Sequence, residues 1–431
     1  MKLLIRKMLS IIICFSLVLS WSAISPAQEA SSTETLEGEA AENRTQDEGE
    51  SEQAESSSQS SAPTESHLPT YQDAPQSNSW ENWPEGPLIE GAAAIVMDLD
   101  TDAILYAKNI DTPHYPASIT KVMTGLLACE YLNPSDSFVM TESAAYGIEP
   151  GSSSIYGDTN EKFTVEQGLM ALMLESANEM ALMLGELVSG SEKKFVELMN
   201  LRARQLGCTH THFNNPNGLP DSTHVTTARD MALIGKAAWN NLTFRRYYTT
   251  DYYEIPPTNI MKETRYLLNN HRMMEGRDYY YEGVVGGKTG YTDDAGNTLV
   301  TFCQRDGMNL VVVVLSSTIG AFPDTAALLD YAYSNFEHLR LSISQNPTPS
   351  LLPSERFILK PAADGGSVFP FRENVVLTIP VGTSRSEISS RQSLESNAAG
   401  PFLIRSEFTY HGHPVGYGIQ YEKKGIGSIL R

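Results

Sequence analysis

The order of strand-like and helical segments is the feature that most limits the fold of this chain. Two runs of strand composition flank a polar DLDTD turn within residues 91–109, and three more lie within residues 283–317. Between them, the stretch from Ser118 to about residue 207 has the periodicity of consecutive helices. We therefore expect an α+β fold, in which one antiparallel sheet is assembled from both ends of the segment. Helices should cover both faces of the sheet, with a helical block inserted.

The segments after this sheet predict one more helix and a second domain. Residues 324–339, DTAALLDYAYSNFEHL, have an amphipathic helical pattern. Beyond them, short apolar runs such as FILKP and NVVLTIPVG alternate with Gly, Pro and Ser. This punctuation is typical of short strands. We expect a main domain over residues 85–340 and a small β domain over residues 347–431.

The first 27 residues have the pattern of a secretory signal peptide. Lys2, Arg6 and Lys7 precede an apolar run, and small residues follow at Ser25-Pro26-Ala27, where cleavage is expected. A retained membrane anchor is the alternative, because the run is short for a membrane span but not excluded as one. Either interpretation places the rest of the chain outside the cytoplasm.

Residues 28–80 predict a disordered acidic linker. This Ser-, Glu- and Gln-rich stretch carries twelve acidic residues against Arg44 alone, a net charge of −11 out of −21 for the whole chain. So few apolar residues cannot offset the entropy of ordering the chain. Since no basic face stands out anywhere in this acidic chain, we expect no nucleic acid partner.

The cysteines predict neither a disulfide framework nor a metal centre. Signal cleavage would leave Cys129, Cys208 and Cys303, an odd number with wide spacing. Cys208, His210 and His212 alternate in CTHTH, but zinc needs a further ligand cluster and the sequence offers none. We expect no metal and no organic cofactor.

Ser118 and Lys121 are the first candidates for chemistry. They stand three residues apart at the start of a predicted helix, so their side chains lie on one face. A serine hydroxyl is a poor nucleophile until a base takes its proton, and a desolvated lysine near another cation can serve as that base. Ser191 and Lys194 have the same spacing. The pair alone is therefore a weak signal.

Two further motifs supply polar groups of the right kind. Ser176-Ala177-Asn178 lies at a predicted break between two helices, where a hydroxyl and an amide can enter a cleft. Lys288-Thr289-Gly290 lies on a predicted strand, where a cation and a hydroxyl can hold a carboxylate and glycine lets the backbone come close. Taken singly, both motifs are weak signals: Ser344-Gln345-Asn346 repeats the first pattern by chance, and Lys-Thr-Gly is also compatible with an ordinary turn.

The order and spacing of the three motifs carry a family resemblance. Ser118, Ser176 and Lys288 follow one another at intervals of 58 and 112 residues. The set resembles that of penicillin-binding proteins and class A β-lactamases. Over about residues 90–335 the chain is similar to the low-molecular-mass penicillin-binding proteins with D-alanyl-D-alanine carboxypeptidase activity, in the segments YPASITKVMT, ESANEMALMLGE, FNNPNGLPDSTHVTTARDMALIGKA and VGGKTGYTDDAGNTLV.

The resemblance implies a role for each motif residue. Ser118 would be the acylated nucleophile, Lys121 its base and Ser176 a proton relay. The substrate would be bound by Asn178, Lys288, Thr289, Gly290 and Thr292. The backbone N–H groups of Ser118 and Thr292 would form the oxyanion hole. The implied substrate is the peptidoglycan stem pentapeptide, the implied inhibitors are β-lactams, and association with the wall or membrane is expected.

Four alternatives remain open from the sequence. One is a class A-like β-lactamase, which places its deacylating water with a glutamate on a loop after the Ser/Asn motif. Residues 198–220 cover the corresponding part of this chain and contain no acidic residue. A transpeptidase would transfer the acyl group to an amine in place of water, and nothing in the sequence excludes this. A β-lactam sensor would acylate and then stop, but sensors usually follow membrane spans that carry the signal inward. The fourth alternative is a wall-binding protein without catalysis. A wall-binding protein would not need all three motifs.

Overall fold

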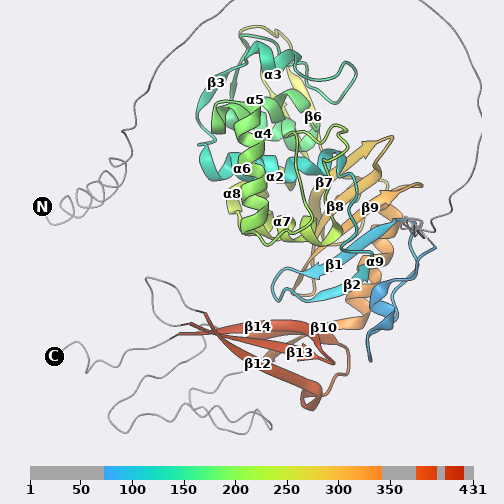
Figure 1. Ribbon diagram of the computed structural model, residues 1–431. Helices are drawn as coiled ribbons and strands as arrows, with labels where there is room; N and C mark the ends of the chain where they lie inside the picture. Colours follow the sequence, from blue (N-terminus) through green and yellow to red (C-terminus); the bar gives the residue numbers. More distant parts are fainter. Residues whose placement is uncertain (1–71, 342–374, 396–402, 422–431) are drawn as a thin grey trace, which may run out of the picture. The chain divides into compact units, whose positions relative to one another are not determined.

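A computed structural model of the chain describes residues 72–341, 375–395 and 403–421 (Figure 1). The described residues all belong to one compact unit. The predicted signal peptide, linker residues 28–71 and the FILKP run lie outside the described residues. Among those that are described, no helix is both long enough and apolar enough to span a membrane.

The main sheet is antiparallel and is built from both ends of the segment, as predicted. Its strand order is β2 (Ile104–Lys108), β1 (Ala93–Asp98), β9 (Met308–Ser317), β8 (Gly296–Arg305) and β7 (Val284–Thr292). The N-terminal hairpin joins the later strands through β1, where Ala93 pairs with Leu315. β8 and β9 are joined by a tight turn, with positive φ at Asp306 and Gly307 as a two-residue hairpin requires. β7 forms one edge of the sheet, and β2 forms the other.

Helices cover both faces of this sheet, because β9 is apolar on both sides. Val311 and Val313 belong to the core cluster that includes residues of the inserted helices. Val312 and Val314 belong to a second cluster with Leu328 of α9 (Ala321–Asn335). Successive side chains of a strand point to opposite faces, so this continuous valine run can serve two cores.

The inserted block is mainly helical. Its helices are α2 (Lys121–Tyr131), α3 (Glu142–Tyr146), α4 (Val165–Leu174), α5 (Asn178–Ser189), α6 (Glu192–Gln205), α7 (Ala228–Asn240) and α8 (Leu242–Tyr248). The expectation of helices alone was wrong in one respect. The short strands β3 (Ser137–Val139) and β4 (Lys162–Thr164) pair within the block, and β5 (Tyr252–Ile255) pairs with β6 (Arg265–Leu268) after it. Strands of three or four residues leave little periodicity in a sequence.

The helix predicted over residues 324–339 is displaced. It begins at Ala321, where Pro323 fits the first turn, and ends at Asn335. Residues 336–341 form β10 instead, which pairs with β11 (Val375–Pro380). Phe336 is buried at the start of β10, and a strand pairing over its whole length outweighs the helical pattern of four residues.

A small β domain follows at the C-terminus, as expected. Its antiparallel sheet has the order β12 (Ile388–Glu395), β13 (Leu403–Tyr410) and β14 (His413–Tyr421). β10 lies before the predicted boundary at residue 347, yet its partner β11 lies after it.

The predicted linker extends too far at its C-terminal end. Residues 76–79 form the 3₁₀ helix η1 (Gln76–Ser79), and the buried Ser77 hydroxyl donates to the carbonyl of Ala107 at 3.4 Å. The Gln76 Oε1 atom accepts the N–H of Ile110 at 3.1 Å. Trp83 is buried just beyond, and its indole N–H donates to Leu105 O at 2.8 Å. These contacts with β2 and its flanks stabilise an order that composition alone did not predict.

Candidate active site

The structure brings Ser118 and Lys121 into contact. Ser118 is partly exposed on the 3₁₀ helix η2 (Ala117–Thr120), and Lys121 is the first residue of α2. The Lys121 Nζ atom lies 3.0 Å from Ser118 Oγ. An accessible hydroxyl therefore stands beside an amine that is fully buried.

Lys121 has two further partners, and both can only accept hydrogen bonds. Its Nζ donates to Asn178 Oδ1 at 2.7 Å and to the carbonyl oxygen of Asn217 at 2.6 Å. A neutral amine carries two N–H bonds, which these two acceptors take up. Its lone pair is then left for the Ser118 hydroxyl, which can donate its proton to Nζ. The contacts of Lys121 thus fit a base directed at Ser118.

The electrostatic surroundings of Lys121 favour this neutral form. Burial holds the pKa of Lys121 well below its usual range, and the charge of Lys288 lowers it further. The carboxylate of Glu179 acts in the opposite direction. Desolvation and a neighbouring cation are the two causes expected to activate a lysine base.

Ser176 and Asn178 lie at the break between α4 and α5, as predicted. Ser176 has a φ of 59°, and this left-handed residue turns the chain between the two helices. Its Oγ is buried and hydrogen-bonds to no described residue. Asn178 is also buried, and its N–H donates to Ser153 O at 2.8 Å. The turn thus presents one unpaired hydroxyl next to the amide that binds Lys121.

Lys288 is buried on the edge strand β7. Its Nζ donates to the carbonyl oxygen of Thr289 at 2.9 Å. Burial lowers the pKa of Lys288 to about 7, against the opposing influence of Glu175. Because Thr289 remains partly exposed beside it, a cation and a hydroxyl are available together at this edge.

Gly290 lies against the segment that carries Ser118. A Cβ atom at Gly290 would stand 2.9 Å from the backbone nitrogen of Ser118 and 2.4 Å from Thr298 Oγ1. Thr298 on β8 also donates its hydroxyl to the carbonyl of Pro116 at 2.8 Å. The Lys-Thr-Gly motif and the Ser-x-x-Lys motif are therefore packed backbone to backbone, which explains the glycine.

The Thr292 side chain makes a contact of a different kind. Its hydroxyl accepts the N–H of Ala295 at 3.1 Å, across the turn between β7 and β8. This bond orders the turn that follows the Lys-Thr-Gly motif. The role of the Thr292 backbone N–H in an oxyanion hole stays a prediction.

Sequence reasoning missed the loop that supplies Asn217. Gly218 has a φ of 88°, and a Cβ there would lie 1.9 Å from the carbonyl oxygen of Ala117. Thr124 on α2 donates its hydroxyl to Pro216 O. The signal was present in the turn-forming NNPNG sequence, but a backbone carbonyl leaves no mark on residue type.

The alternating Cys208, His210 and His212 do not form a metal-binding group. Cys208 is buried, whereas both histidines are exposed. Among the described residues, one cluster of three side chains with suitable spacing occurs, formed by Asp98, Asp100 and His338. His338 Nε2 is hydrogen-bonded to Asp98 Oδ2 at 2.7 Å, so these two groups already satisfy each other.

The fold is that of the penicillin-binding proteins. Penicillin binding protein 5 from Haemophilus influenzae superposes with a TM-score of 0.59 at 26% identity, covering 78% of this chain and 98% of that one. The DD-transpeptidase of Streptomyces K15, solved as a serine-to-alanine mutant, gives a TM-score of 0.54 at 27% identity, covering 57% and 99%.

Residues 81–318 match the family described as D-alanyl-D-alanine carboxypeptidase, and the chain belongs to that family. D-alanyl-D-alanine carboxypeptidase DacF of Bacillus subtilis is 32% identical over 255 residues, which are 58% of this chain and 63% of DacF. DacA of Haemophilus influenzae is 30% identical over 262 residues, 58% of this chain and 64% of DacA. The matched region thus spans less than two thirds of each of these relatives.

Proposed function

We propose that this protein is a serine D-alanyl-D-alanine carboxypeptidase. It removes the terminal D-alanine from peptidoglycan stem pentapeptides through an acyl-enzyme, and penicillins acylate the same serine. The observation that carries the proposal is the contact between the buried Lys121 amine and the Ser118 hydroxyl, with two oxygen acceptors fixing the other side of the amine. Membership of the carboxypeptidase family supports the choice of substrate.

Acylation begins with transfer of the Ser118 proton to Lys121 Nζ. The Ser118 Oγ atom then attacks the carbonyl carbon between the two D-alanine residues, and the backbone N–H of Ser118 stabilises the oxyanion. Collapse of this intermediate breaks the C–N bond, and the proton passes to the departing amine nitrogen. Water then hydrolyses the ester, which releases the shortened peptide and restores the hydroxyl of Ser118.

Ser176 fits the proton relay to the leaving group. Its hydroxyl is buried at the turn before α5 and has no described partner, so it is free to bond with groups of the substrate. Asn178 is held by Lys121 through its Oδ1 atom, which leaves its N–H₂ group to bind a carbonyl of the peptide.

Lys288 and Thr289 fit the terminal carboxylate of the peptide. The pKa of Lys288 is about 7, and an arriving carboxylate favours its protonated form. Gly290 lets the edge of β7 approach the nucleophile segment closely. An extended peptide can add to such an edge by main-chain hydrogen bonds.

The loop facing Lys121 argues against a class A β-lactamase. In those enzymes a glutamate on a loop after the Ser/Asn motif places the deacylating water. Here the corresponding loop contributes the Asn217 carbonyl, and residues 198–220 hold no carboxylate. We therefore expect the penicilloyl-enzyme to persist for minutes or longer.

Export by a signal peptide and contact with the wall follow from the peptidoglycan substrate and belong to the same proposal.

Mass spectrometry after exposure to penicillin tests the function. Wild-type protein should gain one penicilloyl group on Ser118 and release D-alanine from a D-alanyl-D-alanine peptide. The Ser118→Ala variant should show neither event, because it lacks the proposed nucleophile. An adduct on Ser176, or rapid catalytic release of penicilloic acid with no D-alanine freed from peptide, would contradict the proposal.

A further inference from the structure

His224 links the loop that supplies Asn217 to the segment that carries Ser118. Its side chain is buried, and its Nε2 atom lies 2.9 Å from the hydroxyl of Thr120. On the other side of the ring, Nδ1 accepts the backbone N–H of Asn214 at 3.1 Å. Thr120 stands between Ser118 and Lys121 in the sequence. The His224 ring therefore contacts both the segment that carries Lys121 and the loop whose Asn217 carbonyl binds Lys121.

The partners of His224 fix its tautomer. A backbone N–H can only donate, so Nδ1 must be the accepting nitrogen and Nε2 carries the proton that is donated to Thr120. Burial lowers the pKa of His224 to about 4, with His212 and Lys121 acting in the same direction and Asp221 opposing them. The ring is therefore neutral at physiological pH, as the two hydrogen bonds require.

The surrounding backbone holds His224 in this position from two sides. His114, which precedes the nucleophile segment, pairs with Thr226 in an isolated antiparallel bridge. His212, at the start of the Asn217 loop, pairs in the same way with Val225. Residues 224–226 therefore lie between the two segments, and the His224 ring extends this backbone connection to side chains.

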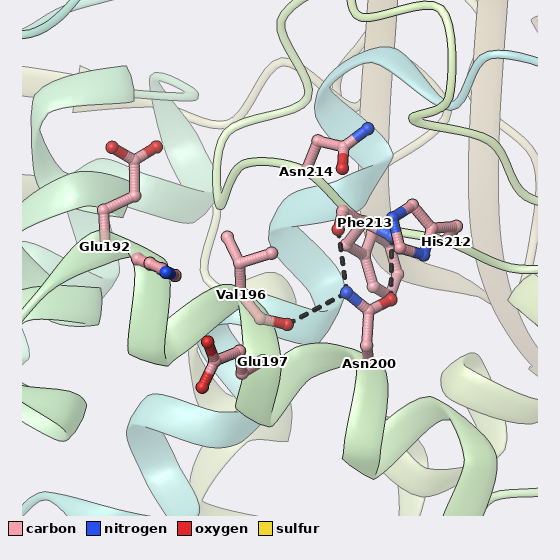
Figure 2. Close-up of a pocket in the computed structure, with 8 residues that line it drawn as sticks. Glu192, Val196, Glu197, Asn200, His212, Phe213 and Asn214 are labelled. Carbon is pink, nitrogen blue, oxygen red and sulfur yellow. Dashed lines mark hydrogen bonds between the residues drawn. The ribbon is translucent and has the colours of Figure 1, made fainter.

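The outer end of the loop is fixed to α6. Figure 2 shows the Asn200 amide bonded to both main-chain groups of Phe213: it donates to the carbonyl oxygen at 2.8 Å and accepts the N–H at 2.9 Å. The Asn214 amide donates to Asp221 Oδ1 at 2.7 Å. His224 joins this anchored end, through the backbone N–H of Asn214, to Thr120 beside Lys121. The Asn217 carbonyl, three residues after Asn214, is thereby held relative to the segment that carries Ser118.

We propose that His224 is a positioning residue, which holds the Asn217 carbonyl and Lys121 in register with Ser118 and so sets the rate of acylation. This inference rests on the proposed function. His224 touches neither the substrate nor the reacting atoms, so its effect passes through Thr120 and the loop. Displacements of about 1 Å at a reacting group can cost 10²-fold in rate.

Two half-substitutions separate the two contacts. In His224→Asn, the shorter amide can still accept from Asn214, but it no longer reaches Thr120. In His224→Gln, the longer amide can still donate to Thr120, but it loses the hydrogen bond from the backbone N–H of Asn214. Thr120→Val removes the hydroxyl, and Thr120→Ser keeps it. His210→Asn is the matched control, because His210 precedes the same loop but is exposed.

The measurement is the rate of penicillin acylation of the full chain by stopped flow, resolved into non-covalent binding and the acylation step. We expect acylation about 10- to 100-fold slower in His224→Asn, His224→Gln and Thr120→Val. Non-covalent binding should not change, because Lys288 and Thr289 hold the carboxylate. Thr120→Ser and His210→Asn should acylate at the wild-type rate. The double variant His224→Asn with Thr120→Val should be no slower than His224→Asn.

Each other outcome has a distinct meaning. Wild-type rates in both His224 variants would overturn the positioning role. So would a loss that appears only as fewer labelled molecules, since that reports misfolding and not a slower step. If the wild-type protein itself gains no adduct, the proposed function fails before His224 is tested.

Discussion

The unpaired hydroxyl of Ser176 leads to a prediction about stability. A buried hydroxyl without a partner costs about 1–3 kcal/mol, and removing it relieves that cost. Ser176→Ala should therefore raise the free energy of unfolding by about 1 kcal/mol while it slows peptide hydrolysis. Denaturant titration and a D-alanine release assay measure the two effects.

Ser154→Ala provides the matched control for this prediction. The Ser154 hydroxyl donates to the buried Glu179 carboxylate at 2.8 Å, so its loss should lower stability instead. A Ser176→Ala variant that is less stable than the wild type would show that the hydroxyl is satisfied within the protein.

Lys288 predicts the alkaline side of the pH profile. Its pKa is about 7, and only its protonated form carries the charge that holds the carboxylate. The value of kcat/KM should thus fall as the pH rises above about 7, whereas protonation of Lys121 causes the fall at low pH.

Lys288→Arg should lower kcat/KM but abolish the alkaline fall, because arginine stays charged. Lys193→Arg, at an exposed lysine, should keep the wild-type profile. An alkaline fall that persists in Lys288→Arg would assign it to another group.

At the scale of residues, the sequence predicted several side chains of the site, but not their backbone partners. The contact of Ser118 with Lys121 was expected from their spacing, and the family resemblance added Asn178 as a substrate contact. The structure joins all three by hydrogen bonds. The Asn217 carbonyl and the unpaired state of Ser176 could not be predicted, because both depend on backbone placement across distant segments.

Among the elements, the contact between β8 and the nucleophile segment carries a prediction. Thr298 donates its buried hydroxyl to Pro116 O, two residues before Ser118. Thr298→Val should lower stability by about 1 kcal/mol and slow acylation about 10-fold, because η2 loses its anchor to the sheet. Thr298→Ser, which keeps the oxygen, should restore the rate in the same labelling assay. Equal slowing in both variants would point to packing of the threonine methyl group.

The prediction of helices and strands succeeded where the apolar pattern extended over many residues. The hairpin β1–β2, the break between α4 and α5 and the strands β7 to β9 were all expected from it. It failed at β10, where a helical pattern and a strand share four residues. Which one forms depends on the partner strand β11, more than thirty residues later in the chain, and local periodicity contains no such information.

For the whole molecule, the point at which the described structure begins predicts where truncation becomes harmful. Removing residues 28–71 should leave hydrolysis of a soluble peptide unchanged, whereas removal through residue 83 should destabilise the protein. Trp83 packs against Phe336 with ring centroids 5.3 Å apart, and truncating a buried tryptophan costs about 3–5 kcal/mol. Thermal unfolding of the two truncations, with Trp83→Ala in the full chain, checks this. Equal melting temperatures for both truncations would show that η1 and Trp83 contribute nothing.

The order of the strands would have a mechanical consequence if the chain were anchored through its N-terminal residues. Residues 76–79 are hydrogen-bonded to β2 and its flank, so any pull through the preceding chain enters the sheet at that edge. Lys288 lies on β7, at the opposite edge, with β1, β9 and β8 between them. Such a load would therefore peel η1 away, or shear the N-terminal hairpin, before it strained the strand that carries Lys288.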